Sequence, residues 1–248
     1  LARVMDAWTA KYPDRDGYLF PYDPLVFDQL LRGEGAQPYY SVPFYPLHKL
    51  MAGLLDQWTH AGSAQARDLV ERMAAWVADA TAFADDDDEL WQTVLLTEWG
   101  GMNDVLFGLF AVTGDAAHLR TARRFDARCF TGPLAAGVDD LADQPFPHAN
   151  FHLPEVVGSA RAFEVTGNAT DAAVVRNFYA ALRANHSFAT GGSSSGECWQ
   201  RPRDLGAFLS PETQESCTTY NALKIARHRF VQAGDVAAAD DYERMLLN

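Results

Sequence analysis

The sequence predicts an all-α fold built from consecutive helical hairpins, and three observations support this prediction. Apolar residues recur at steps of three and four residues, most clearly over residues 47–58 and 69–80, which is the spacing of a helix with one buried face. The alternation typical of half-buried strands is almost absent. A turn that contains glycine also recurs at nearly constant intervals along the chain.

Each copy of this turn joins the end of one expected helix to the start of the next. It contains a glycine that can end a helix, and then a small polar residue that can cap the following helix. The four copies are HAGSAQARDLVERM at 60–73, VTGDAAHLRTARRF at 112–125, VTGNATDAAVVRNF at 165–178 and QAGDVAAADDYERM at 232–245.

The spacing of the turns suggests how the hairpins assemble. Gly62, Gly114 and Gly167 are 52 and 53 residues apart, about the length of two helices and two connections. Such hairpins close into an (α/α)6 barrel or stay open as a solenoid. We favour the (α/α)6 barrel because solenoid repeats are shorter. Six hairpins need roughly 310 residues, so we expect residues 1–248 to form one barrel domain that is truncated at both ends.

The composition narrows the choice of partners and compartment. The 248 residues include 20 Lys and Arg against 33 Asp and Glu, a formal net charge of −13, which argues against nucleic acid or an anionic membrane as the partner. No apolar run is long enough to span a bilayer, and the first residues lack the pattern of a signal peptide. We therefore expect a soluble protein. The cytoplasm is the expected compartment, but the sequence does not establish it. Three cysteines are too few for a disulfide framework.

Polar and aromatic residues gather in four connections between helices, at 39–49, 97–104, 144–154 and 191–217. In a toroid, alternate connections fall at the same end, so these four should converge on one pocket. A carbohydrate site needs hydrogen-bonding side chains and an aromatic face for the sugar ring. We predict that the substrate contacts come from these connections, and that they are made by His48, Asn103, His148, His152 and Trp199. The histidines have an alternative role, which is to satisfy backbone groups at helix starts.

The longest connection also contains two candidate groups for chemistry. Glu197 lies within Gly-Glu-Cys-Trp at 196–199, where a carboxyl group could act as the proton donor in glycosidic cleavage. Glu215 and Cys217 are two residues apart, close enough to bind one zinc ion together. The alternatives are a solvated loop carboxylate for Glu197 and a small buried thiol for Cys217.

Other motifs in the sequence are weak evidence for a catalytic or binding site. Residues 192–196 match the G-x-S-x-G pattern of serine hydrolases, but the preceding residues are expected to be helical, whereas that motif follows a strand. There is no phosphate-binding Gly-Lys-Ser/Thr sequence and no HExxH zinc motif. The acidic run at 85–89 is expected to be solvated near a helix N-terminus.

Five segments together resemble a known family across nearly the whole chain: FYPLHKLMAGLLD, EWGGMNDVL, FPHANFHLPEVVGSARAFEVTG, TGGSSSGECWQRP and LSPETQESCTTYNALKIAR. They are similar to the β-L-arabinofuranosidases of glycoside hydrolase families 127 and 146. The resemblance implies an (α/α)6 barrel, retaining hydrolysis of β-L-arabinofuranosides, and a zinc site of one Glu and three Cys in which one Cys is the nucleophile.

Carried over by motif, Glu197 corresponds to the general acid/base, Glu215 and Cys217 to two zinc ligands, and His48 to a sugar-binding residue. Neither Cys129 nor Cys198 matches the remaining cysteines, so the resemblance implies that the nucleophile lies beyond residue 248. We then expect residues 1–248 alone to be inactive and to bind zinc weakly.

Two alternatives of other kinds stay open. A metal-independent (α/α)6 enzyme, such as an unsaturated-uronyl hydrolase or a sugar epimerase, would use carboxylates and histidines alone. A noncatalytic helical-repeat module would bind a protein or glycan in its groove.

Overall fold

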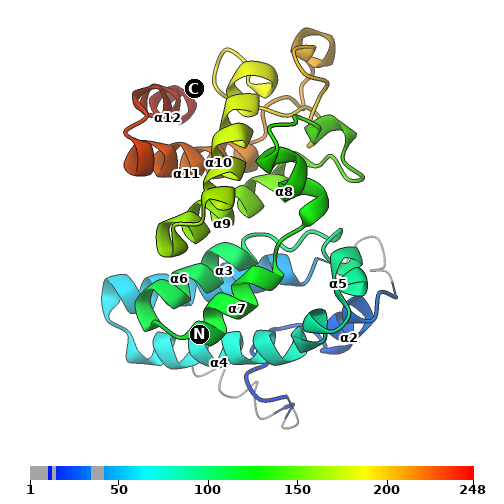
Figure 1. Cartoon of the computed structure of the whole chain (residues 1–248), viewed down its shortest axis with the longest axis vertical. Helices are drawn as coiled ribbons and strands as arrows, with labels where there is room; N and C mark the ends of the chain where they lie inside the picture. The colour runs from blue at the N-terminus through cyan, green and yellow to red at the C-terminus, as the bar shows by residue number, and fades with distance from the viewer. Residues whose placement is uncertain (1–10, 13–14, 35–41) are drawn as a thin grey trace. The chain divides into compact units, whose positions relative to one another are not determined.

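The computed structural model describes residues 11–12, 15–34 and 42–248, and within these ranges the regular structure is helical with no strand longer than an isolated bridge (Figure 1). This confirms the all-α prediction. The start of the predicted site segment at 39–49, residues 39–41, lies outside the described residues. The chain divides into two compact units, Leu1–Asp126 and Ala127–Asn248. The expectation of a single domain stays a prediction.

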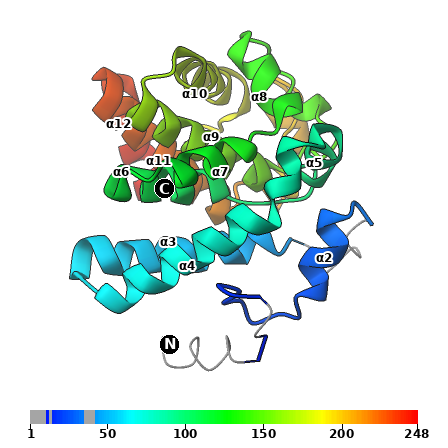
Figure 2. The same cartoon turned by 60° about the horizontal axis from the view of Figure 1, so that its bottom comes forward.

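The first unit contains two long helical hairpins. Its helices are α2 (Leu25–Leu31), α3 (Phe44–Ala61), α4 (Ala64–Ala80), α5 (Asp88–Val94), α6 (Met102–Thr113) and α7 (Ala116–Arg124), with the 3-10 turn η1 (Ala82–Asp85) before α5. α3 packs against α4, and α6 against α7; Figure 2 shows the α3–α4 hairpin running antiparallel. The core of this unit includes aromatic rings that pack edge to face, such as Phe44 and Phe125, whose centroids are 5.2 Å apart.

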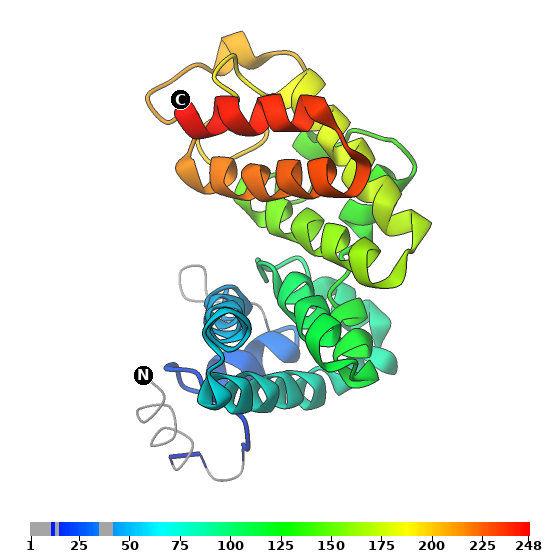
Figure 3. The same cartoon turned by 90° about the vertical axis from the view of Figure 1, so that its left-hand side faces the viewer.

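The second unit contains two further hairpins and the long connection. Its helices are α8 (Arg128–Ala135), α9 (Ala149–Thr166), α10 (Ala169–Ala181), α11 (Ser216–Ala233) and α12 (Val236–Leu247), with the short turns η2 (Leu141–Asp143), η3 (Leu182–His186) and η4 (Leu205–Phe208). Most of α9 is buried because it packs against both α10 and α11. α11 and α12 form the last hairpin, which is seen side-on in Figure 3.

The four repeated turns have one common geometry, as the sequence predicts. The glycine that ends each hairpin's first helix is left-handed, with φ of 66°, 68°, 69° and 63° at Gly62, Gly114, Gly167 and Gly234. The next residue then caps the second helix through its side chain. For example, Ser63 accepts a hydrogen bond from the Ala66 N–H and Asp115 from the Ala117 N–H.

The long connection between η3 and α11 is ordered by backbone pairing with the start of α9. The Ala149 N–H donates to the Glu197 carbonyl over 2.8 Å, and the Trp199 N–H donates to the Pro147 carbonyl over 2.8 Å. Residues 197–199 therefore lie beside residues 147–149, although 50 positions separate them in sequence. This pairing brings two of the four predicted site segments together.

Candidate active site

Glu197 projects from a tight turn at the edge of the second unit. Its backbone is left-handed, with φ of 65°, a conformation that costs about 1–2 kcal/mol in a residue with a Cβ. Its side chain is 63% exposed. The carboxylate is thus open to solvent while its backbone is fixed by the pairing with residues 147–149.

His148 faces this carboxylate from the N-cap of α9. Its Nδ1 accepts a hydrogen bond from the Phe151 N–H over 3.0 Å, so in the neutral ring the proton sits on Nε2. Nε2 lies 3.5 Å from the Glu197 Oε2. The ring of Phe146 stacks on the imidazole with centroids 5.5 Å apart and planes at 7°. The predicted general acid and a predicted sugar-binding residue therefore meet in one place.

His152 and Trp199 lie beneath this pair, inside the core. The Trp199 Nε1–H donates to His152 Nδ1 over 3.0 Å, and Phe130 stacks on the His152 ring at 4.3 Å. Burial, with a smaller contribution from His148, lowers the pKa of His152 to about 3, so the imidazole stays neutral. Both side chains are buried, and this geometry makes them supports for the turn of Glu197. Their predicted contact with substrate stays a prediction.

Glu215 and Cys217 form a second cluster where α11 begins. Burial, a hydrogen bond to the Glu215 carboxylate and that carboxylate's charge raise the pKa of the Cys217 thiol to about 12. The Glu215 Oε2 is buried and has no hydrogen-bond partner in the described part of the chain, an arrangement that costs free energy unless another group binds there.

This Glu–Cys pair fits part of a zinc site. It combines a carboxylate oxygen with a thiol, both of which bind zinc, and the buried Oε2 offers an unused lone pair. Among the residues that the structure describes, no group of three or more His, Cys, Asp and Glu side chains could hold a metal ion. The pair therefore supplies two ligands, and a complete site needs others.

His48 and Asn103 belong to the first unit and lie near the Gly100–Gly101 pair. The His48 ring packs so closely on Gly100 that an added Cβ would lie 2.3 Å from its Nδ1. Gly100 is also left-handed, with φ of 63°. Asn103, in the first turn of α6, accepts a hydrogen bond from the Asp104 N–H through its side chain. The prediction that both residues join the site of Glu197 stays a prediction.

The sequence contains no clear signal for two residues of the second unit. Phe146, which stacks on His148, gave no signal beyond its place beside a histidine. Glu155 is a buried carboxylate on α9, and the polarity of Glu gives no hint of that burial. Ser194, the central serine of the G-x-S-x-G match, has a buried hydroxyl with no hydrogen-bond partner in the described residues, so none of those residues is placed to activate it as a base.

The family comparison gives the class of this helical chain, which is a glycoside hydrolase catalytic domain. The chain belongs to the family of GH127 β-L-arabinofuranosidase catalytic domains, whose model matches residues 2–248. No curated protein matches the sequence.

Solved structures of glycoside hydrolases share the helical fold of this chain. A GH127 β-arabinofuranosidase superposes with a TM-score of 0.66 at 16% identity, over 100% of this chain and 40% of that one. A GH127 β-L-arabinofuranosidase from Geobacillus stearothermophilus T6 gives 0.64 at 16% identity, over 94% and 40%. A protein described as a glycoside hydrolase gives 0.65 at 16%, over 99% and 42%. The chain therefore spans about two fifths of the length of these structures. No helix in the described ranges is long and apolar enough to cross a membrane.

Proposed function

We propose that the protein containing this chain is a retaining glycoside hydrolase that acts on β-L-arabinofuranosides, with Glu197 as its general acid/base. The observation that carries the proposal is the exposed Glu197 carboxylate held 3.5 Å from His148 Nε2 on a braced turn. Membership of the GH127 family supports the substrate class.

In this mechanism Glu197 moves the proton in both halves of the reaction. Its carboxyl group protonates the leaving glycosidic oxygen in the first half, and the resulting carboxylate deprotonates the attacking water in the second. His148 is a positioning residue, because its Nε2–H points toward Glu197 and its Nδ1 is occupied by the Phe151 N–H. Trp199 and His152 hold the turn from below, so the carboxylate keeps its direction between the two halves.

Glu215 and Cys217 are the residues of this chain that would hold zinc. Zinc bound there, with further ligands, would keep a cysteine thiolate available as the nucleophile at neutral pH. The buried, unpartnered Glu215 Oε2 supports this part of the proposal.

The decisive variant is Glu197→Gln, compared with Glu212→Gln on the exposed part of the same connection. For an alkyl arabinofuranoside we expect kcat/KM to fall about 10²–10⁴-fold in Glu197→Gln, the usual contribution of a general acid. The loss should be smaller for a nitrophenyl arabinofuranoside, because its leaving group departs without a proton. Glu212→Gln should keep full activity. Unchanged turnover of both substrates by Glu197→Gln would overturn the assignment.

Measurements on the intact protein also test the two alternatives, a metal-independent enzyme and a noncatalytic binding module. We expect the intact protein to contain stoichiometric zinc by elemental analysis, and Cys217→Ser to lose most of it. Full activity without bound metal would favour a metal-independent (α/α)6 enzyme. Binding of a glycan with no turnover by the wild-type protein would favour a noncatalytic module.

A further inference from the structure

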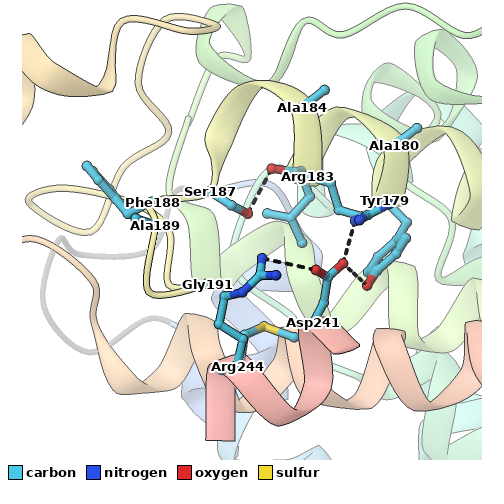
Figure 4. A pocket seen from close by; sticks show the side chains of 12 residues that line it. Tyr179, Ala180, Arg183, Ala184, Ser187, Phe188, Ala189, Gly191, Asp241 and Arg244 are labelled. Carbon is cyan, nitrogen blue, oxygen red and sulfur yellow. Dashed lines mark hydrogen bonds and ion pairs between the residues drawn. The ribbon is translucent and has the colours of Figure 1, made fainter. Parts of the chain in front are cut away.

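A separate cavity of about 560 Å³ lies in the second unit, between the end of α10 with its continuation η3, residues 187–191 and α12 (Figure 4). Its volume falls in the range of small-molecule sites. None of the residues lining it belongs to the Glu197 site or to the Glu215–Cys217 pair. The proposed glycosidase mechanism therefore leaves it without a role.

A single carboxylate organises the polar side of this cavity. Asp241 Oδ2 accepts a hydrogen bond from the Tyr179 hydroxyl over 2.7 Å and pairs with the Nε of Arg183. Its Oδ1 pairs with a terminal nitrogen of Arg244 at 3.4 Å. Two guanidinium charges thus surround one carboxylate, which leaves the cluster with a formal charge of +1.

The two arginines keep donors available for a ligand. The side chains of Arg183 and Arg244 are 45% and 51% exposed, whereas that of Asp241 is 11% exposed. Each guanidinium carries five N–H groups, and Asp241 occupies only part of them. Figure 4 shows the two arginines reaching Asp241 from different sides, Arg183 from η3 and Arg244 from α12. The carboxylate therefore holds the two cations ready in fixed positions.

The rest of the cavity is walled by a constrained backbone and apolar side chains. Gly191 is left-handed at φ 94°, and an added Cβ would lie 2.8 Å from the Met245 Cγ, so residues 187–191 are seated directly on α12. The Ser187 hydroxyl donates to the Leu182 carbonyl over 2.9 Å and ties the same segment to η3. η3 is a π-helical turn, a feature often found at functional sites. Phe188 adds an aromatic ring to the lining.

We propose that this cavity binds a small organic carboxylate of about the size of a sugar ring. The ligand's carboxylate takes the free guanidinium donors of Arg183 and Arg244, a pairing that can be bidentate. A charge of +1 matches a monoanion, and a volume of about 560 Å³ leaves room for an organic body that free phosphate would not fill. Phe188 and Met245 cover the apolar part of that body.

The test is calorimetric titration of the intact protein with D-galacturonate, with D-galactose as the neutral counterpart and inorganic phosphate as the bare anion. We expect galacturonate to bind, and galactose to bind at least about tenfold more weakly because it lacks the charge-assisted contact. Phosphate should also bind at least about tenfold more weakly, because it has no organic body to fill the cavity. Equal binding of galactose would overturn the proposal, as would binding of phosphate alone.

Three variants identify the site. Arg244→Gln, at a half-exposed position, should weaken galacturonate at least about tenfold, whereas Arg227→Gln, an exposed arginine of α11 outside the cavity, should leave it unchanged. Asp241→Asn should tighten binding severalfold, because the amide oxygen still accepts hydrogen bonds from the two arginines but no longer repels the ligand's carboxylate. Unchanged affinity in Arg244→Gln, or weaker binding in a folded Asp241→Asn, would overturn the proposal.

Discussion

The hairpin turns and the connection from residue 187 to residue 215 solve the same problem of chain reversal in different ways. In the turns, left-handed backbone falls on Gly62, Gly114, Gly167 and Gly234, where nothing lies within 4 Å of the position a Cβ would take. In the connection it also falls on residues that have a Cβ, which are Ser194, Glu197, Arg203 and Gln214. The turns are relaxed and the connection is strained.

This difference teaches where the protein places its chemistry. A strained position persists only where its surroundings fix it, and such positions cluster at functional sites. Glu197 is the strained residue that also bears the candidate acid, and its backbone carbonyl is bound by the Ala149 N–H. The helical hairpins stabilise the fold, and the surrounding contacts hold the Glu197 backbone in a strained conformation that directs its carboxylate outward.

The largest expected effect comes from Glu197→Gly, which separates strain from function. Glycine adopts positive φ without penalty, so we expect the free energy of unfolding to rise by about 1 kcal/mol. Activity on alkyl arabinofuranosides should fall about 10²–10⁴-fold, because the proton donor is gone. Urea denaturation and initial rates measure the two effects on one sample. A variant less stable than wild type would show that the left-handed turn carries no strain.

Gly100→Ala compared with Gly62→Ala should give the next largest effect. Both glycines are left-handed, at φ 63° and 66°, but an added Cβ would meet the His48 ring at 2.3 Å only at Gly100. We expect Gly62→Ala to cost about 1 kcal/mol from its backbone alone. Gly100→Ala should cost roughly 2–4 kcal/mol, because overpacking adds to the same strain. Equal shifts in the denaturation midpoint would mean that His48 moves aside freely.

The smallest expected effect concerns pH and a part-buried ion pair between α9 and α11 in the second unit. Glu164 on α9 pairs with His228 on α11 at 2.8 Å. Burial opposes ionisation of Glu164, but the hydrogen bond and charge of His228, with Arg161 and Gln232, lower its pKa to about 2 from an ordinary value of 4.5.

Because the pKa of Glu164 is lower in the folded protein, the pair stabilises the fold fully above about pH 4.5, and this stability is lost as the pH falls toward 2. Glu164→Gln should therefore lower the melting temperature at pH 7 by a few degrees, corresponding to about 1 kcal/mol after solvent screening. At pH 2.5 the two proteins should melt closer together. A constant difference at both pH values would exclude this linkage.

The regular parts of the fold could be predicted from the sequence because they depend on local rules. The glycine and cap at each turn, such as Gly114 and Asp115, carry their geometry in two adjacent residues. The apolar spacing of residues 47–58 likewise locates α3 (Phe44–Ala61). Both signals are contained within a few turns of helix, so no tertiary information is needed to interpret them.

The candidate site was predictable only in part. The motifs pointed to Glu197 and His148, and their meeting follows from a backbone pairing between segments 50 positions apart. The left-handed φ at Glu197 could not be foreseen, because that conformation is set by the surrounding structure and not by the residue type. The Asp241 cluster could not be predicted either. Tyr179 lies 62 positions away from Asp241, and both residues belong to ordinary helical patterns.

The indole of Trp199 links the acid-bearing turn to the interior of the second unit. It lies two residues after Glu197, is buried, and bonds to a histidine of α9. An outward movement of the turn would have to expose the Trp199 indole to solvent and break its hydrogen bond to His152 Nδ1. The backbone that carries Glu197 is thus fixed to the interior of the second unit, so any group that meets this carboxylate has to adjust to its position.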